Sequence, residues 1–590
     1  MQNWASSPIK LASHTLFVLS VAWGQSEFIE SFDPEKSLPE SDLIILKNAD
    51  IFYRELTPES AELLAQLSFI SESDVRELLD IENRVDSLKI TSPFLQKLIQ
   101  SIWADQKASP VSGMITQRMN RTEDIQYRWA FDKKFDNYQL GVLGERDAGE
   151  LSAVDYSAFY LKSRWRQIDF ILGNYQFLTG HGLVSWRSMP LKSDFGASNS
   201  VMRVGKGIQP YRSGHESWAL RGIALRKEFE FGLLFTGFSS RKLDGTIKGN
   251  SVSISHSGLH QSESQLEKKN NLSEIIFLNQ YTHPIRHGNL SIVLGLGEWE
   301  QNASRLSNQI LSFVGQFQKE FISVSGESSV NTFGNSAYIF SSKMKWDSFQ
   351  YGLSTRWIEP NYFGLRDNVF RNWNSLELGE AGILHEIRFK LKPAFITVYS
   401  DQFKRLKSAI GHFTQTGSET GLKVDTKLTP THQITFQTKW QENTSHSYDY
   451  TISDYNPTSS IRTKIHLKWH RSKRNTVQCQ LQQRNHPIHQ IKSYGLQFRN
   501  QLRQDRWKLN QFWMSTIIQD DQWLYFWDLT LPGEMRSKVF TNSGHFMGCS
   551  ISYDASQLSE IHFRISSHWP QLDFEVVPIV RSAIQINLFI

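Results

Sequence analysis

Residues 461–470 read Ile461-Arg462-Thr463-Lys464-Ile465-His466-Leu467-Lys468-Trp469-His470. Successive side chains of a β-strand point to opposite faces of the sheet, so this order places Ile, Thr, Ile, Leu and Trp on one face and Arg, Lys, His, Lys and His on the other. The same period of two recurs in residues 387–392, 434–440 and 477–482. From Gly113 onward this period dominates the chain, which predicts a protein built mainly of antiparallel β-strands.

The two faces of these strands favour a membrane barrel over a soluble sheet. A soluble β-sandwich or propeller also alternates, because one face of each sheet is buried. Here, however, the polar faces carry long Arg, Lys and Gln side chains, which suit a wide wet lumen, and the strands run about 10 to 13 residues, beyond the usual 5 or 6 of soluble sheets. We therefore expect residues 113–590 to form a large outer-membrane β-barrel of about 24 antiparallel strands, an even number.

Two segments near the C-terminus fit this interpretation. In Trp523-Leu524-Tyr525-Phe526-Trp527-Asp528-Leu529-Thr530-Leu531 aromatic side chains flank aliphatic ones on one face, as expected of a strand that crosses an aromatic girdle at a membrane interface. The last segment, Ile584-Gln585-Ile586-Asn587-Leu588-Phe589-Ile590, alternates to its end and resembles the C-terminal insertion signal of outer-membrane barrels. We expect both segments to be barrel strands.

Composition indicates the same class of protein. Aromatic residues make up 13% of the chain, with 18 Trp, and barrels use such rings in girdles at both membrane interfaces. The two cysteines, Cys479 and Cys549, are too few for a disulfide framework or a cysteine-based zinc site. No window holds the roughly 18 consecutive apolar residues of a transmembrane helix, so a chain that enters a membrane must cross it as a closed barrel.

The N-terminus carries a pattern typical of an export signal. A single lysine precedes an apolar stretch around Leu16-Phe17-Val18-Leu19, and Ala22-Trp23-Gly24 supplies small residues at the two positions that a signal peptidase reads. We interpret residues 1–24 as a signal peptide cleaved before Gln25; a short buried element of a soluble domain is the alternative. Residues 25–51, which follow, are acidic and irregular.

Residues 52–104 change to a helical period. Thr57 can cap the N-terminus of a helix that has a proline at its first position, and further helix starts lie near Ser71 and Ser92. Apolar residues recur at helical spacing after each start. We expect three or four short helices here, followed by a linker over residues 105–112.

The helical region also resembles a known repeat. Residues 64–79, with Ser68, Phe69, Ile70 and Ser71 as the hairpin, resemble the degenerate helix-hairpin-helix repeat of competence-protein type, related to the second domain of RuvA. In that repeat a glycine-containing hairpin brings backbone amides to a nucleic-acid phosphate, whereas this hairpin contains no glycine.

The whole chain resembles a family of large barrels. The order of signal, helices and barrel, together with glycine-rich segments at 173–177, 180–183 and 205–211, resembles outer-membrane β-barrel proteins of Bacteroidota that carry a helix-hairpin-helix domain. This resemblance implies an architecture and an outer-membrane location. It implies no activity.

Charge bears on whether the helical region binds nucleic acid. Residues 25–110 contain 17 Asp and Glu against 8 Lys and Arg, a net charge of −9. Binding a polyanion requires the opposite balance. We therefore expect a plug, or an adaptor for a periplasmic protein partner, and keep DNA binding as the alternative.

A long loop over residues 181–216, rich in Gly, Ser, Arg and Lys, is the most distinctive part of the barrel region. A connection of about 35 residues exceeds what a turn needs, and such loops usually fold into a lumen or form a binding surface; a disordered loop is the alternative. The candidate site consists of four cations around this loop, Arg203, Lys206, Arg212 and Arg221. These cations either form lumen ion pairs, which we favour, or contact an anionic ligand.

No segment carries a catalytic signature: there is no Gly-x-Ser-x-Gly, His-Glu-x-x-His, P-loop or paired-cysteine motif. His466 and His470 lie on a polar strand face, where solvated side chains are expected rather than metal ligands. We expect no enzyme activity, no cofactor and no metal. The favoured function is a transport or assembly component in contact with outer-membrane lipid, with its helical domain in the periplasm. A nucleic-acid uptake protein and a secreted soluble β-rich enzyme are the alternatives.

Overall fold

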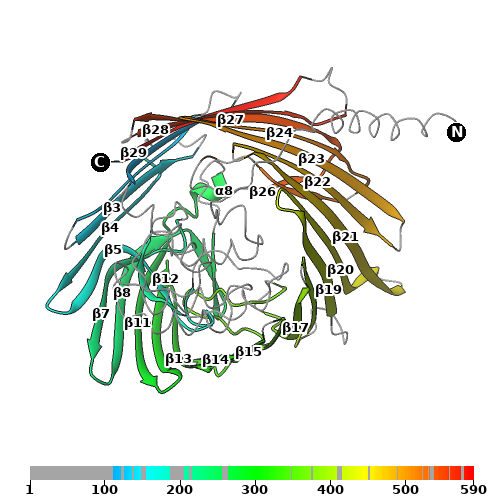
Figure 1. Ribbon diagram of the computed structural model, residues 1–590. Helices are drawn as coiled ribbons and strands as arrows, with labels where there is room; N and C mark the ends of the chain where they lie inside the picture. Colours follow the sequence, from blue (N-terminus) through cyan, green and yellow to red (C-terminus); the bar gives the residue numbers. More distant parts are fainter. Residues whose placement is uncertain are drawn as a thin grey trace, which may run out of the picture.

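The computed structural model describes a ring of β-strands and the loops attached to it (Figure 1). The described residues are 111–120, 125–135, 138–147, 154–186, 205–211, 216–255, 263–319, 321–346, 348–373, 377–391, 393–407, 415–449, 452–472, 474–487, 490–520, 522–528, 531, 537–556, 559–572 and 577–589. The expected signal peptide (1–24), acidic segment (25–51) and helical domain (52–104) lie outside them.

Within the described residues, 24 antiparallel strands form the ring, and β6 (Gly207–Pro210) joins the same 25-stranded sheet through β5 alone. The first seven strands of the ring are β1 (Val111–Asn120), β2 (Ile125–Lys134), β3 (Tyr138–Arg146), β4 (Tyr156–Trp165), β5 (Ile168–Leu178), β7 (Leu220–Phe229) and β8 (Gly232–Leu243). The next nine are β11 (Leu272–Ile285), β12 (Gly288–Gln301), β13 (Ser304–Lys319), β14 (Ile322–Asn331), β15 (Ser336–Lys345), β16 (Phe349–Ile358), β17 (Glu380–Leu391), β18 (Ala394–Lys404) and β19 (Thr416–Thr429). The last eight are β20 (His432–Asp449), β21 (Ile452–Ser472), β22 (Asn475–His486), β23 (Ile491–Gln504), β24 (Trp507–Ile517), β27 (Gly544–Ser556), β28 (Ser559–Trp569) and β29 (Ile579–Phe589).

The first and last strands of the ring pair with each other. β1 and β29 are antiparallel, from Val111 opposite Phe589 to Asn120 opposite Arg581. An antiparallel ring closes in this way only if its number of strands is even, because each strand must run opposite to both neighbours. The expectation of one large antiparallel barrel of about 24 strands is therefore confirmed, and its last segment is a barrel strand.

The two rims of the barrel differ in their connections. At one rim, here called the short-turn rim, consecutive strands are joined by two or three residues, as between β4 and β5 or β22 and β21. At the other, the long-loop rim, connections reach 41 residues, between β5 and β7. Both β1 and β29 have their outer ends at the short-turn rim.

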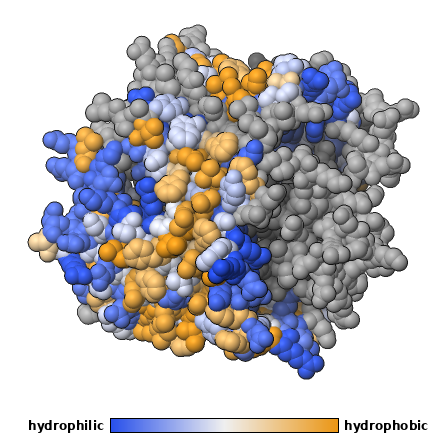
Figure 2. All heavy atoms as spheres, turned by 90° about the vertical axis from the view of Figure 1, so that its left-hand side faces the viewer, coloured by the Kyte–Doolittle hydropathy of each residue, from blue (hydrophilic) through white to orange (hydrophobic). Residues whose placement is uncertain are grey.

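The strands place apolar side chains outside and polar ones inside. On β21 and β22, Leu467 and Leu481 are 44% and 45% exposed on the outer face, whereas His466 and Gln480 line the lumen between the same strands. The register inferred from the alternation at 461–470 is thus the observed one. Figure 2 shows a band of apolar side chains across the outer face, with hydrophilic residues on either side.

Aromatic rings follow the short-turn rim around the barrel. Contacting pairs occur beside successive turns, namely Phe135 with Tyr138, Phe229 with Phe231, Phe321 with Trp346, His432 with Trp469, and Trp507 with Tyr553. We call this set the rim belt. Rings of this kind form the girdles of membrane barrels, where one end of each ring is apolar and the other is wet.

The described part of residues 523–531 does not form a barrel strand. Their regular part, β25 (Leu524–Trp527), pairs only with β26 (Ser537–Phe540), in a two-stranded sheet of its own. Leu524 and Phe526 are buried against Phe512 and Phe546 of the barrel wall. The girdle-strand prediction was wrong, because alternating apolar residues serve equally well on a hairpin packed against an apolar patch.

Other small elements accompany the long loops. β9 (Gly245–Lys248) pairs with β10 (Ser251–Ile254), and α8 (Glu263–Leu266) precedes β11. In the part of the chain that the structure describes, no helix has the length and apolar character needed to cross a membrane.

Candidate functional site: the inward loops of the lumen

Two loops from the long-loop rim meet inside the barrel, against the inner face of its wall. The β5 loop (residues 179–186) follows β5, and the β16 loop (residues 359–373) follows β16. Ser185 and Arg366 form a parallel bridge between them. The backbone N–H of Trp186 donates to the carbonyl of Arg366 at 2.9 Å. The backbone N–H of Asn368 donates to the carbonyl of Gly182 at 3.1 Å. The two loops therefore form one unit of backbone structure.

Both loops are packed against apolar side chains from the inner wall. Leu183 and Val184 of the β5 loop are fully buried, and Tyr362 of the β16 loop is as well. Val184 belongs to the cluster that also contains Val293 of β12 and many inward residues of β5 to β13. An apolar patch on the inner wall thus provides the burial that draws the loops inward, at roughly 25 cal/mol for each Å² removed from water.

The side chain of Glu327 on β14 binds the backbone of the β5 loop. Its carboxylate accepts the N–H of His181 at 2.6 Å and the N–H of Leu183 at 3.2 Å. The Ser312 hydroxyl donates to its other oxygen at 3.0 Å. Hydrogen bonds to a charged acceptor are stronger than neutral ones, and two buried amides that would otherwise lack partners are satisfied here.

Tyr362 links the two loops to the same strand. Its hydroxyl lies 3.1 Å from the carbonyl of Leu183 and 2.9 Å from the hydroxyl of Ser329 on β14. His181 Nε2 lies 3.0 Å from Ser325 Oγ on that strand. Glu327, Ser325 and Ser329 alternate along β14, so one inward face of a single strand contacts both loops.

A second set of contacts joins the β16 loop to β11. Arg366 forms an ion pair with Glu274, and both side chains are buried. The indole N–H of Trp299 donates to Glu274 at 2.8 Å, and Arg241 Nε lies 3.6 Å from the same carboxylate. Two guanidinium groups and an indole thus surround one carboxylate. Such a buried group is tolerated only because it is paired and hydrogen-bonded.

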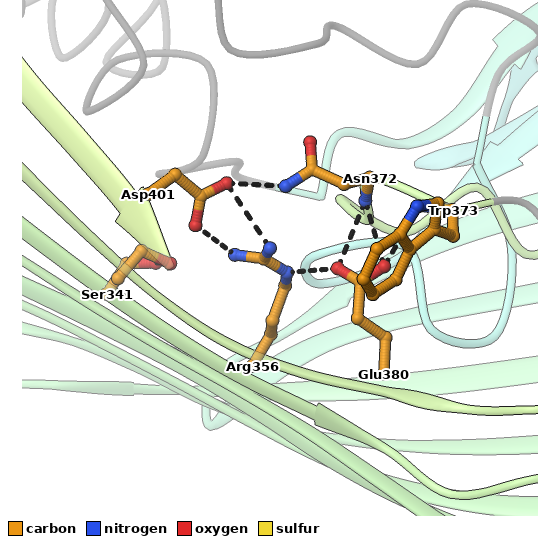
Figure 3. A network of polar contacts seen from close by, with 7 residues as sticks. Ser341, Arg356, Asn372, Trp373, Glu380 and Asp401 are labelled. Carbon is orange, nitrogen blue, oxygen red and sulfur yellow. Dashed lines mark hydrogen bonds and ion pairs between the residues drawn. The ribbon is translucent and has the colours of Figure 1, made fainter. Parts of the chain in front are cut away.

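Arg356 of β16 organises the far end of the β16 loop (Figure 3). Its guanidinium binds Asp401 of β18 at 2.9 and 3.2 Å and Glu380 of β17 at 2.7 Å. Asn372 then donates to both carboxylates, through its side chain at 2.7 Å to Asp401 and through its backbone at 3.0 Å to Glu380. The N–H of Trp373 also donates to Glu380, at 2.9 Å. The network ties the loop to three neighbouring strands.

Burial shifts the titration of the loop residues. Burial raises the pKa of Tyr362 well above its ordinary value, so its hydroxyl is neutral and available as a donor. Burial also raises the pKa of Asp367, against the opposing effect of Arg371, which lies 3.5 Å away. The aspartate in turn accepts the N–H of Gly364 at 3.1 Å and shapes the turn of the loop.

This arrangement places two loops inside the lumen, where they occupy space and hold charged and apolar side chains. The loops contribute ionisable contacts and an apolar underside, and they offer no group of three metal-binding side chains; none occurs elsewhere among the residues that the structure describes. Cys479 and Cys549 are both free.

The site residues predicted from the sequence lie in different parts of the chain, and only some of them are described by the structure. The hairpin residues Ser68, Phe69, Ile70 and Ser71, and the cations Arg203 and Arg212, lie outside the described residues. Lys206 precedes β6, and its carbonyl accepts the side-chain N–H of Gln209 at 3.4 Å. Arg221 lies on β7 with an exposed side chain, and its guanidinium carbon is 5.7 Å from the ring centre of Phe159 on the outer face. The structure does not bring Lys206 and Arg221 together.

The residues that hold the loops were missed by the sequence prediction. Glu327, Glu274 and Arg356 each stand on a strand whose polar face points inward, and alternation alone does not show which inward side chains bind a loop. A signal was present in Glu327, which follows Ser323 and Ser325 at a period of two and is the sole carboxylate of its strand. Its partner lies 146 residues away, and no local pattern points to that partner.

Comparison with known proteins adds a general likeness. No family model and no curated protein sequence matches the chain. Among solved structures, it resembles the copper transporter OprC (TM-score 0.42, 5% identity, 81% of this chain and 82% of that one). It also resembles the siderophore receptor PirA of Pseudomonas aeruginosa (0.40, 9%, 81% and 80%) and the FrpB iron transporter of Neisseria meningitidis (0.39, 6%, 82% of both). These similarities are too distant to indicate what this chain binds, and its architecture rests on its own strand pairing.

Proposed function

We propose that this protein is an outer-membrane barrel that passes polar solutes, with the β5 and β16 loops restricting its lumen from the long-loop side. The observation that carries the proposal is the closed antiparallel ring with an apolar outer face and a charged inner one. In lipid every backbone polar group must find a partner within the protein, and a ring without edges meets that demand.

The aromatic residues fit the thickness of a membrane. Tyr338 of β15 stacks on Trp357 near the long-loop rim, and Trp346, which directly follows the other end of β15, belongs to the rim belt. Eight residues separate Tyr338 from Trp346, about 27 Å along the strand. A tilt of roughly 40° reduces this to about 20 Å of height, close to the apolar band of outer-membrane barrels.

The rims suggest an orientation. Outer-membrane barrels have short periplasmic turns and longer external loops. By this rule the short-turn rim faces the periplasm, and so does the start of β1, to which residues 52–104 connect. This supports a periplasmic position for the helical region and an external origin for the two inward loops.

Location and transport can be tested together. The chain is expected to fractionate with the outer membrane and to migrate faster on gels when it is not heated. Reconstituted into planar bilayers, it is expected to show discrete conductance steps. Recovery from the soluble periplasm would exclude the barrel in a membrane, and membrane insertion without conductance or solute flux would exclude transport.

We further propose that the acidic helical region acts as a plug or adaptor at the short-turn rim. Residues 25–110 carry a net charge of −9, and residues 111–590 carry +13. A cationic lumen focuses its field at the mouth, and a tethered partner is held there at high effective concentration. Deleting residues 30–105 is then expected to raise conductance, and salt is expected to favour release of the plug in the full chain. Equal conductance of both proteins would leave only the adaptor role.

A further inference from the structure

One part of the barrel has no carboxylate at all. Residues 455–504 contain ten Lys and Arg and neither Asp nor Glu over 50 consecutive positions. They supply nearly all of β21 and the whole of β22 and β23, which are neighbours in the ring. A broad sector of the barrel wall is therefore cationic by sequence.

The strand register turns this sequence into an ordered inner surface. Lys468, Gln478 and Arg499 lie opposite one another in one row across the three strands. His466, Gln480 and Gln497 form the next row, two residues closer to the long-loop rim. Lys464 and Gln482 begin the third row. Successive rows are about 7 Å apart.

Part of this inner surface borders a depression in the lumen wall, whose lining does not include Lys468 or Gln482. Its volume is about 170 Å³, and Lys464, His466, Arg499 and four glutamines are among its lining residues. The alternate residues Leu467, Leu481 and Phe498 are exposed on the outer face, which confirms that the lining side chains point inward. The depression is thus lined by cations and amides and lies on the inside of the barrel.

The amide of Gln482 gives a second, independent observation. This side chain is fully buried, and neither its amide oxygen nor its nitrogen has a hydrogen-bond partner in the part of the chain that the structure describes. It lies directly opposite Lys464 on the adjacent strand. Leaving a buried amide unsatisfied costs about 1 to 3 kcal/mol, so a group that supplies its hydrogen bonds would be bound favourably.

The cationic wall continues toward the long-loop rim. Arg462 and Arg484 pack on the ring of Trp523, with guanidinium carbons 4.8 and 3.9 Å from its centre. The buried carboxylate nearby in the chain, Asp528, is paired with Arg564 on β28 at 2.8 Å. The loop that covers this end thus brings an aromatic face to the two arginines.

The adjacent wall is built differently. On β19 and β20, Lys423 lies 3.1 Å from Asp425, and Lys439 lies 2.7 Å from Glu419. These lysines are neutralised by carboxylates of the same wall. On β21 to β23 the one carboxylate is Asp454, close to the long-loop end of β21, and residues 455–504 contain none. The sequence of this part of the wall is therefore cationic, whereas that of β19 and β20 mixes both charges.

We propose that the inner wall formed by Lys464, His466, Lys468, Gln482 and Arg499 is a binding surface for solutes that carry several carboxylate or phosphate groups. The cations bind the anionic groups, and the glutamine amides between them bind neighbouring hydroxyls or oxygens. Rings of Lys and Arg select anions in other pores by the same attraction. The inference rests on the proposed function, because it names the class of solute that the lumen accepts.

The test uses the purified full chain in detergent, with inorganic tripolyphosphate as the probe and isothermal titration calorimetry as the measurement. The wild type is expected to bind saturably at 50 mM salt and several-fold more weakly at 300 mM, because exposed charges are screened. The double variant K464Q/K468Q is expected to bind at least tenfold more weakly. The matched control K423Q/K439Q removes the same two charges from the adjacent wall and is expected to stay within threefold of the wild type.

Two outcomes would overturn the proposal: no saturable binding by the wild type, or an equal loss in the two double variants. Each variant is first checked for folding by its faster migration on gels when it is not heated. If K464Q/K468Q does not fold, the single variant R499Q takes its place in the binding measurement. Failure of the proposed transport function would be distinguishable from failure of this binding proposal. A protein that binds tripolyphosphate but never conducts in bilayers would refute transport and retain the binding wall.

Discussion

The carboxylate of Glu327 accepts the backbone N–H of His181 at 2.6 Å, although the two residues are 146 positions apart in the chain. Glu327 stands on the inner face of β14, and His181 stands in the loop that enters the lumen after β5. The same oxygen accepts the N–H of Leu183. A single side chain of the wall thus satisfies two backbone amides of this loop inside the barrel.

Replacing Glu327 is expected to release the β5 loop. Glu327→Leu leaves two buried amides without an acceptor, at about 1 to 3 kcal/mol for each unsatisfied group. Amide hydrogen exchange in residues 179–186 is expected to accelerate by about tenfold or more, and mean conductance in bilayers to rise. The control is Glu419→Gln, a lumen carboxylate on β19 that contacts Tyr399 and Lys439. Unchanged exchange in Glu327→Leu would show that apolar packing alone holds the loop.

Arg356 is expected to be a main stabilising residue of the barrel interior. Its side chain and those of Glu380 and Asp401 are at most 2% exposed. Removing the cation leaves two buried carboxylates without their partner, and breaking a buried pair in this way costs about 3 to 5 kcal/mol. The free energy of unfolding of Arg356→Ala, measured by urea denaturation in lipid, is expected to fall by that amount.

A second variant separates the ion pair from general damage. Removing Asp401 together with Arg356 is expected to restore part of the loss, because one uncompensated charge disappears. The coupling between the two substitutions should reach about 0.5 to 3 kcal/mol, as for residues in one network. Strict additivity would mean that the guanidinium acts through its packing on Phe370, whose ring centre is 4.7 Å away.

The cost of a charge on the outer face is expected to depend on depth. Leu481 lies near the middle of β22, whereas Leu467 is two residues from Trp469 of the rim belt. Leu481→Arg is expected to lower the free energy of unfolding by about 2 to 4 kcal/mol and Leu467→Arg by about 1, because arginine costs most at the membrane midplane. His466→Arg, on the lumen side, is expected to be nearly silent. Equal losses in all three would refute a lipid-facing outer surface.

A loop at the long-loop rim is expected to weaken as pH rises. Burial, followed by the carboxylates of Asp155, Asp244 and Asp147, raises the pKa of Glu216 from 4.5 to about 8. The folded loop therefore holds a proton that an unfolded chain releases. Stability from this residue is fully present below about pH 4.5 and is lost progressively as pH rises to about 8.

Hydrogen exchange of residues 216–219 measures this effect. Exchange, corrected for its intrinsic pH dependence, is expected to accelerate between pH 5 and 8 in the wild type and to lose that dependence in Glu216→Gln. The control Glu298→Gln changes an exposed rim carboxylate, paired with Arg305, and should leave the wild-type profile intact. A persistent pH dependence in Glu216→Gln would assign the effect to another group.

The alternation at 461–470 predicted both the strand and its orientation. Leu467 is outside and His466 inside, as the pattern indicates. The same reasoning was wrong for residues 523–531, where Leu524 and Phe526 are buried in the lumen against Phe512. Period two reports that one face of a strand is apolar. It does not report whether that face contacts the surroundings of the barrel or the interior of the protein.

The sequence by itself determined the class of fold, because the period of two is a local property that repeats along the chain. Only the tertiary structure decided which charges meet in the lumen. Arg366 pairs with Glu274, 92 positions earlier, and Glu327 meets His181 across an even longer span. Such meetings depend on strand register and on the closure of β1 against β29, which together fix the angular position of every strand. A local pattern carries no information about that angle.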